Sequence, residues 1–206
     1  MRIVRDGIYY ACGLILVGLV LSYFWGPWAG VLFYVLAAFC VYFFRDPDRV
    51  SPEGELILAP ADGKVVSVLS LSPSETRISI FLNIFNVHVN RTPVPGEITA
   101  LDYRKGKFLV ASHEQASLEN EQNTLVLESV RGRVICRQIA GLIARRIVCY
   151  RKVGDRLRTG DRIGYIKFGS RVDVIFGPEW RTAVKVGDRV SAGVSVLAEP
   201  VDQVEA

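Results

Sequence analysis

The sequence has few residues of the kinds that hold metal ions or disulfide frameworks. It contains two histidines and four cysteines in 206 residues, and none of them stands at the spacing of a metal site. Four cysteines are also too few for a disulfide scaffold of this length. A P-loop and a G-x-G-x-x-G fingerprint are both missing, so nucleotide binding has no support. Low-complexity tracts are absent as well, which excludes a disordered chain.

Apolar residues are present in excess, and they are concentrated near the N-terminus. Residues 8–25 and 28–44 carry no charged side chain, and Gly26-Pro27 between them would break a continuous helix. Each run is slightly shorter than the ~20 residues that span a bilayer core. Aromatic residues cluster near the run ends, as in interfacial belts. We predict an α-helical membrane hairpin over 1–50, spanning or re-entrant, with a buried hairpin of a soluble protein as the alternative.

Arginines flank this hairpin on both sides, with Arg2 and Arg5 before it and Arg45 and Arg49 after it. By the positive-inside rule both flanks are cytoplasmic. The sequence therefore predicts a protein of the cell membrane whose residues 51–206 lie on the cytoplasmic side. Ten Lys and Arg against two Asp between 131 and 162 suggest a basic face for anionic lipid headgroups. Nucleic acid fits less well as a partner of a membrane-anchored chain.

From about residue 56 the pattern changes to short β-branched runs bounded by Gly, Pro and Asp, which is typical of β-strands. The sequence KVGDR occurs at 152–156 and again at 185–189, each time followed by a further Gly and an apolar run. These Gly-Asp turns resemble the hairpins of biotinyl/lipoyl-type barrel-sandwich domains. We therefore predict a mainly β, barrel-sandwich-like domain over 51–206. Residues 111–124 are polar without periodicity and are predicted to form a loop.

Local sequence suggests three side chains for chemistry. His88 lies in FNVHVNRTP, which predicts a strand with His88 on its polar face. Asp62 lies in PADG, where an Asp before Gly usually caps its own turn. Gly169-Ser170 is the only Gly-Ser step, and the glycine removes steric bulk beside a nucleophilic hydroxyl. A Ser/His/Asp hydrolase is conceivable, although a G-x-S-x-G elbow is missing.

Five segments together indicate a known family: PADGKV at 60–65, FNVHVNRTPVPG at 85–96, ENEQN at 119–123, IAGLIARRIVCY at 139–150 and GDRIGYIKFGSRVDV at 160–174. From about residue 45 to its end the chain resembles the phosphatidylserine decarboxylase proenzymes, in particular their short bacterial and archaeal form. FGSRVD together with NVHVNR is the specific pair. The resemblance implies a pyruvoyl-dependent carboxy-lyase of phospholipid biosynthesis, which converts phosphatidylserine in the membrane to phosphatidylethanolamine and CO2.

The resemblance also implies self-cleavage between Gly169 and Ser170 into a β chain, 1–169, and an α chain, 170–206, that remain an αβ heterodimer. Ser170 would first attack the Gly169 carbonyl and then, as a pyruvoyl group, form a Schiff base with the substrate amine. No metal and no pyridoxal phosphate are needed for this chemistry. His88 is implied as the acid and base, and Asp62 as the residue that orients the histidine or assists cleavage. Apart from the resemblance, Arg145 and Arg146 are our candidates for binding the substrate phosphate.

Longer members of the family resemble H-x-x-H in this region, whereas three residues after His88 this chain has Arg91, which cannot act as a base at neutral pH. Either His88 serves both self-cleavage and later protonation, which we favour, or cleavage relies on strain and oxyanion stabilisation. Two other functions stay open. One is a pyruvoyl-dependent decarboxylase of a soluble amino acid, and the other is a non-catalytic, membrane-anchored barrel-sandwich adaptor.

Overall fold

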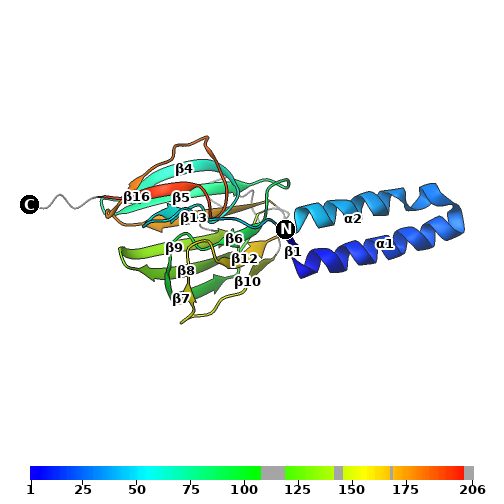
Figure 1. Ribbon diagram of the computed structural model, residues 1–206, viewed down its shortest axis with the longest axis horizontal. Helices are drawn as coiled ribbons and strands as arrows, with labels where there is room; N and C mark the ends of the chain where they lie inside the picture. Colours follow the sequence, from blue (N-terminus) through cyan, green and yellow to red (C-terminus); the bar gives the residue numbers. More distant parts are fainter. Residues whose placement is uncertain (108–118, 142–145, 168, 202–206) are drawn as a thin grey trace, which may run out of the picture. The chain divides into compact units, whose positions relative to one another are not determined.

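The computed structural model describes residues 1–107, 119–141, 146–167 and 169–201. The chain forms two compact units, Met1–Asp48 and Arg49–Ala206. The first unit is mainly helical, and the second is built of antiparallel strands (Figure 1). The mainly β fold with an N-terminal apolar helix confirms the predicted fold class.

The first unit is a helical hairpin made of α1 (Arg5–Trp25), the 3-10 helix η1 (Pro27–Gly30) and α2 (Val31–Phe43). Two short strands, β1 (Arg2–Ile3) and β2 (Arg45–Asp46), pair at its open end. The two helices lie side by side (Figure 1), and a Cβ at Gly30 would clash with the carbonyl oxygen of Gly18. Glycine at both positions therefore permits the close approach of the helices.

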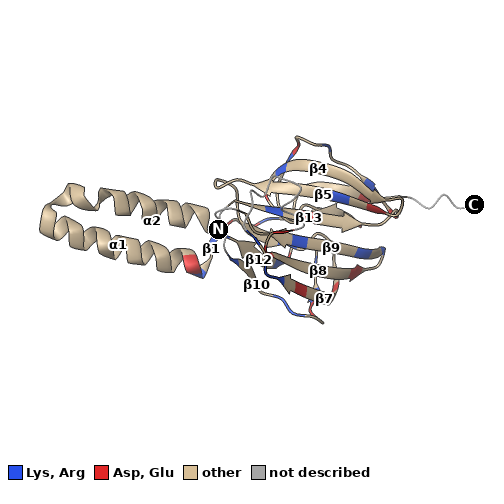
Figure 2. Ribbon diagram, turned by 180° about the vertical axis from the view of Figure 1, so that it is seen from behind, with Lys and Arg blue, Asp and Glu red and all other residues tan. Residues whose placement is uncertain are grey.

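The hairpin is uncharged between its ends (Figure 2), and most of its large apolar side chains are exposed. Among the described residues one helix, α1, is long and apolar enough to cross a membrane, and the helical segment Pro27–Phe43 is shorter. An apolar surface left exposed to water is unfavourable, so these helices need a lipid or protein environment.

The second unit is built around an eight-stranded antiparallel sheet with the order β11-β7-β8-β9-β13-β5-β4-β15. Figure 1 shows its six longest strands, from β4 to β7, following one another in this order. The strands are β4 (Gly63–Ser72), β5 (Glu75–Leu82), β7 (Gly96–Arg104), β8 (Gln122–Ser129), β9 (Gly132–Ile139), β11 (Arg156–Leu157), β13 (Ser170–Phe176) and β15 (Arg189–Val190).

Two three-stranded sheets complete this unit, with the orders β10-β12-β6 and β14-β16-β3. Their strands are β3 (Ile57–Leu58), β6 (Val89–Arg91), β10 (Ile147–Cys149), β12 (Arg162–Ile166), β14 (Trp180–Thr182) and β16 (Val196–Pro200). Apolar side chains from all three sheets form one core, and β13 lies at its centre, with Val172 and Val174 buried in it.

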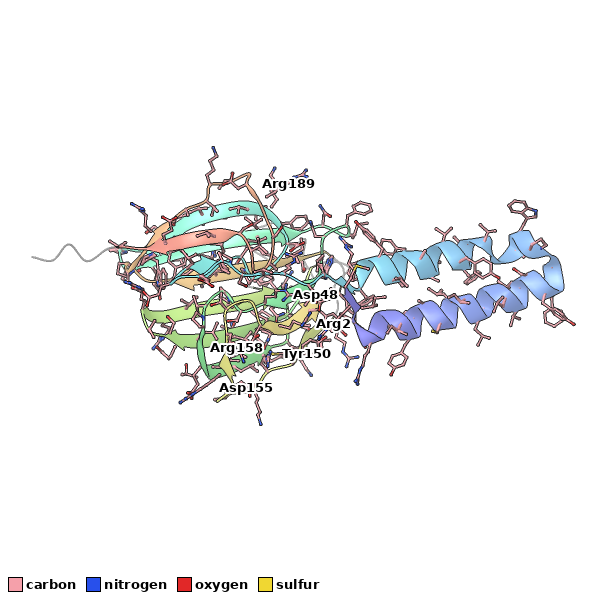
Figure 3. The ribbon with its side chains drawn as sticks, viewed as in Figure 1. Arg2, Asp48, Tyr150, Asp155, Arg158 and Arg189 are labelled. Carbon is pink, nitrogen blue, oxygen red and sulfur yellow. The ribbon has the colours of Figure 1, made fainter. Side chains whose placement is uncertain are left out.

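The two KVGDR copies form matching turns at opposite edges of the large sheet. In one turn Asp155 Oδ2 accepts a hydrogen bond of 3.1 Å from the Lys152 amide, and in the other Asp188 Oδ2 accepts one of 2.9 Å from the Lys185 amide. Each turn leads into an edge strand, β11 beside β7 and β15 beside β4. Asp155 and Arg189 mark these two edges in Figure 3. The sequence repeat thus corresponds to a structural repeat.

The loop predicted over 111–124 differs from the structure at its C-terminal end. Asn120 and Asn123 are fully buried, and β8 already begins at Gln122. Asn120 Nδ2 donates a 2.7 Å hydrogen bond to the carbonyl of Ala140, which gives this polar side chain an interior partner. The earlier part of the predicted loop, including His113, lies outside the described residues.

Candidate active site

Ser170 is the first residue of β13, the strand between β5 and β9 in the large sheet. Its side chain is fully buried, and its Oγ has no hydrogen-bond partner within the described ranges. Gly169 before it has a φ of 53°, in the left-handed region, and a Cβ there would meet no atom within 4 Å. Conformation rather than lack of space therefore favours glycine at this position. A buried hydroxyl without a partner beside such a residue is a candidate reaction centre.

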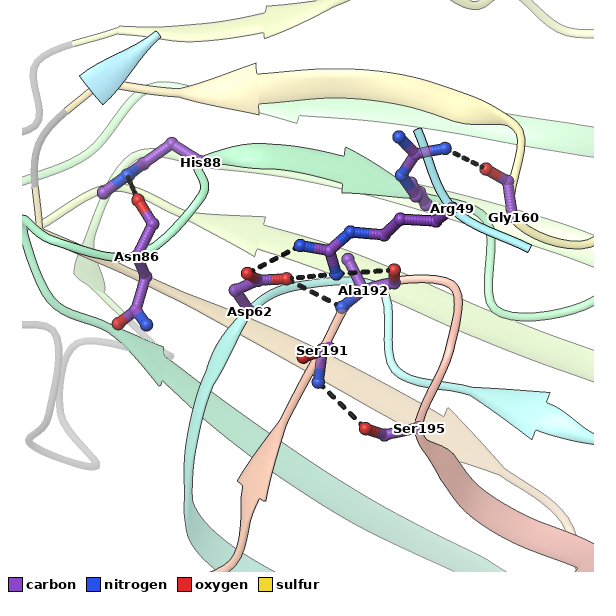
Figure 4. A network of polar contacts seen from close by, with 9 residues as sticks. Arg49, Asp62, Asn86, His88, Gly160, Ser191, Ala192 and Ser195 are labelled. Carbon is purple, nitrogen blue, oxygen red and sulfur yellow. Dashed lines mark hydrogen bonds and ion pairs between the residues drawn. The ribbon is translucent and has the colours of Figure 1, made fainter. Parts of the chain in front are cut away.

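His88 directly precedes β6 and is only 2% exposed. Its Nδ1 lies 2.9 Å from the carbonyl oxygen of Asn86, and a ring that donates this bond keeps Nε2 as the basic nitrogen (Figure 4). The sequence predicts His88 on the polar face, and in the structure this residue is buried. The polar face of this strand is the inner one, because Asn90 is also buried and bonds to a side chain of the large sheet.

Strand register and one hydrogen bond connect the core side of β13, which carries Ser170, with Asn90 of β6. Ser170 shares the core side of β13 with Val172, and Val172 is paired with Gln138 of β9. Gln138 in turn bonds to Asn90, which follows the buried His88 by two residues. The segment that carries His88 is thus joined by one buried hydrogen bond to the sheet that carries Ser170.

Three buried carboxamides form a hydrogen-bonded chain across this interior. Asn123 Nδ2 donates to Gln138 Oε1 at 2.9 Å, and Gln138 Nε2 donates to Asn90 Oδ1 at 2.8 Å. All three residues are 0% exposed, and the two end atoms, Asn90 Nδ2 and Asn123 Oδ1, have no partner in the described part of the chain. The sequence analysis did not predict this row of hydrogen-bonded carboxamides. Polar residues on one face of otherwise apolar strands were a signal for it.

Asp62 belongs to a different set of contacts. Arg49 Nη1 and Nη2 donate to its two carboxylate oxygens at 2.6 and 2.8 Å, and the Ala192 amide donates to Oδ1 at 2.8 Å. Arg49 Nη1 also donates to the carbonyl of Ala192 at 2.9 Å, which closes the network (Figure 4). Within the described ranges, Asp62 thus bonds to Arg49 and Ala192 rather than to His88. Arg49, predicted only as a flanking cation, is its ion-pair partner.

Of the two arginines predicted to bind phosphate, Arg145 lies outside the described residues, and Arg146 is exposed just before β10. Tyr103 of β7 hydrogen-bonds to Glu121. Burial and then this bond raise the pKa of Tyr103 to about 12, and the positive charge of Arg146 acts in the opposite direction. The positive charge of the basic segment 131–162 is partly neutralised, since Arg133 forms an ion pair with Glu128 of the neighbouring strand.

Comparisons with known proteins identify the family of the chain. Residues 36–198 match the phosphatidylserine decarboxylase family. The chain is also 51% identical over 203 residues to a protein of Solibacter usitatus (strain Ellin6076) named phosphatidylserine decarboxylase proenzyme, and the match covers 98% of this chain and 99% of the relative. The chain is therefore a carboxy-lyase. It belongs to the phosphatidylserine decarboxylase family, which confirms the resemblance seen in the sequence and the assignment to phospholipid biosynthesis.

Proposed function

We propose that the chain is a proenzyme that cuts itself between Gly169 and Ser170 and then converts phosphatidylserine to phosphatidylethanolamine and CO2. The observation that carries the proposal is the buried Ser170 hydroxyl directly after a left-handed Gly169 in a chain of this family. The name of the Solibacter relative, a proenzyme, supports processing of the chain.

Self-cleavage begins when Ser170 Oγ attacks the Gly169 carbonyl carbon and the amide nitrogen leaves with a proton, so that an ester replaces the peptide bond. A base then removes the Ser170 α-proton, and the Gly169 carboxylate leaves by β-elimination. The resulting dehydroalanine tautomerises to an imine, which water hydrolyses to a ketone and ammonia. We assign the base to His88, because it is buried, its Nδ1 bond to Asn86 leaves Nε2 as the basic nitrogen, and Asn90 two residues later is joined to the sheet that carries Ser170.

The site fits a pyruvoyl group at position 170, because the Ser170 hydroxyl is enclosed and no described side chain competes for it. A pyruvoyl group at this position would supply a ketone able to condense with the substrate amine and to accept the electrons released with CO2. His88 then returns a proton to the carbon that lost CO2. The enclosed position excludes bulk water, and Arg145 and Arg146 bind the substrate phosphate in this proposal.

The proposed products stay together as an αβ heterodimer. Segment 170–206 contributes β13, which pairs with β5 and β9, and β16, which pairs with β3. We assign residues 1–50 to a membrane hairpin and 51–206 to a catalytic domain. The apolar α1 supports membrane association, and the flanking arginines support a cytoplasmic catalytic domain.

Denaturing electrophoresis and mass spectrometry of the purified chain test the proposal. We expect fragments of 169 and 37 residues, the second blocked at its N-terminus, and we expect Ser170→Ala to remain uncut and inactive. The cleaved protein should release CO2 from phosphatidylserine vesicles but not from free serine. A single intact chain without activity would favour the adaptor, and CO2 from a free amino acid alone would favour the soluble-substrate decarboxylase.

A further inference from the structure

The turn between β5 and β6 exposes two large apolar side chains, Ile84 at 37% and Phe85 at 62%. Hydrogen bonds hold the turn in one conformation. The Asn83 amide donates to Asn86 Oδ1 at 2.9 Å, and the Phe85 amide donates to Asn83 Oδ1 at 2.8 Å. The Asn86 amide also donates to the Asn83 carbonyl at 3.1 Å. The two asparagines thus stabilise a tip that carries apolar rather than polar side chains.

This turn begins and ends at the candidate active site. Leu82, the residue before it, is paired with Ser170 in the large sheet. His88 follows it and is joined to Asn86 through Nδ1. Ile84 is two residues from Leu82, a reach of at most ~7 Å along the backbone. The apolar tip is therefore held next to the residues proposed to react.

Two cations emerge at the same end of the small sheet. The Ile166 amide at the end of β12 donates to the His88 carbonyl at 3.4 Å, and Lys167 comes next in the chain. The Lys167 amide donates to the carbonyl of Arg146, whose side chain is exposed. The exposed Arg146 and the half-buried Lys167 are thus linked through the backbone to His88, which follows the apolar turn. Basic residues near an exposed apolar tip fit a membrane surface, where anionic headgroups cover a hydrocarbon interior.

We propose that Ile84 and Phe85 insert into the interface of a phospholipid bilayer, so that the turn Asn83–Asn86 docks His88 and Ser170 against the headgroup layer. This inference rests on the proposed function, because it supplies the route from bilayer substrate to enclosed site. A bilayer is the favoured occupant because Arg146 and Lys167 complement anionic headgroups. Two apolar side chains are also far too small for a stable protein interface, which buries roughly 1,200–2,000 Å².

The docking surface is tested by comparing activity on phosphatidylserine in a bilayer with activity on dissolved, monomeric phosphatidylserine. Full-length protein in proteoliposomes is assayed with phosphatidylserine in vesicles and with a short-chain phosphatidylserine below its micelle concentration. Phe85→Ser and Ile84→Ser should raise the apparent KM for vesicles about tenfold. They should leave kcat/KM for the monomeric substrate within about twofold and self-cleavage complete. Phe85→Trp should act like the parent, because the indole also favours the interface.

The matched control is Leu71→Ser. Leu71 is 46% exposed on β4, beside the end of β5 that lies away from Leu82. The Leu71→Ser variant should have the activity of the parent on both vesicle and monomeric substrate. Phe85→Ser would overturn the docking surface if it lost activity equally on vesicles and on monomeric substrate, or if it lost no activity on vesicles. In either case, activity of the parent protein would still uphold the proposed function.

A second readout does not require activity. Vesicle lipids with a photoactivatable carbene precursor in the acyl chain should label the peptide that contains residues 83–87 more strongly than the one that contains Leu71. Absence of preferential labelling would overturn the docking surface even if the enzyme is active. Preferential labelling of a chain that decarboxylates neither substrate form would uphold the surface and overturn the proposed function.

Discussion

Arg49 and Asp62 are joined by two hydrogen bonds, of 2.6 and 2.8 Å, and both also bind the backbone of Ala192. Ala192 lies in the segment that follows the proposed cleavage site, whereas Arg49 and Asp62 precede it. Through its bonds to Ala192, the ion pair of one proposed product therefore holds the other, in addition to any role of Asp62 in cleavage.

We expect Asp62→Asn and Arg49→Met to weaken the attachment of segment 170–206 by about 2 kcal/mol, because each leaves a polar group largely buried without its partner. The measurement is the urea concentration at which the 37-residue fragment dissociates from the cleaved protein. Arg181→Gln is the matched control, since its pair with Glu199 is well exposed and should contribute little. Equal midpoints for Asp62→Asn and the parent would contradict this role.

Gly169→Ala should fold but cleave itself about tenfold more slowly. The side chain has space, yet a left-handed conformation costs a non-glycine residue ~1–2 kcal/mol, and tenfold in rate corresponds to about 1.4 kcal/mol. A time course of fragment formation after synthesis measures the effect. Gly154→Ala carries similar strain, with φ of 88° and an open site, and should cleave normally. Equal rates for the two variants would show that the Gly169 conformation does not matter for attack.

Gln138→Leu should lower the free energy of unfolding by on the order of 3 kcal/mol, because Asn90 and Asn123 both lose a buried partner. Gln138→Glu separates hydrogen bonding from packing. A carboxylate can accept from Asn123 but cannot donate to Asn90, whereas the protonated acid can do both. The stability of Gln138→Glu relative to the parent should therefore improve as pH falls. Denaturant unfolding at several pH values makes the comparison, and a pH-independent difference would rule out the bond to Asn90.

Tyr103→Phe should make stability less sensitive to alkaline pH. The pKa of Tyr103 is raised to about 12 from an ordinary value near 10, so the fold favours the neutral phenol. Its contribution is fully present below about pH 10 and is lost as the pH rises through about 12. Thermal midpoints of parent and variant at pH 9 and 11 measure this. An identical fall in the two proteins would mean that the hydrogen bond to Glu121 does not govern the alkaline transition.

Local patterns in the sequence predicted most of the fold. The KVGDR repeat encodes its turns within a few residues, because each Asp bonds to an amide three positions earlier. The uncharged runs separated by Gly26-Pro27 encode a helical hairpin in the same way.

The contacts of the site join residues that are far apart in the chain. The periodicity of the sequence carries no information about such contacts. Asn90 bonds to Gln138 across 48 positions, which turns the polar side of β6 inward and carries His88 with it. Asp62 and Ala192 are separated by 130 positions. Alternation alone predicts which residues share a face, but tertiary contacts decide which face is buried.

The position of β13 has a consequence for the order of events in the life of the chain. Because this strand is hydrogen-bonded on both sides, the large sheet without residues 170–176 would be split into two parts. Neither part could close the core by itself, and each would present an open strand edge to other chains. Synthesis as one polypeptide supplies the central strand at high local concentration. Folding must therefore precede the proposed scission of the peptide bond, and separately made 1–169 and 170–206 should aggregate rather than assemble.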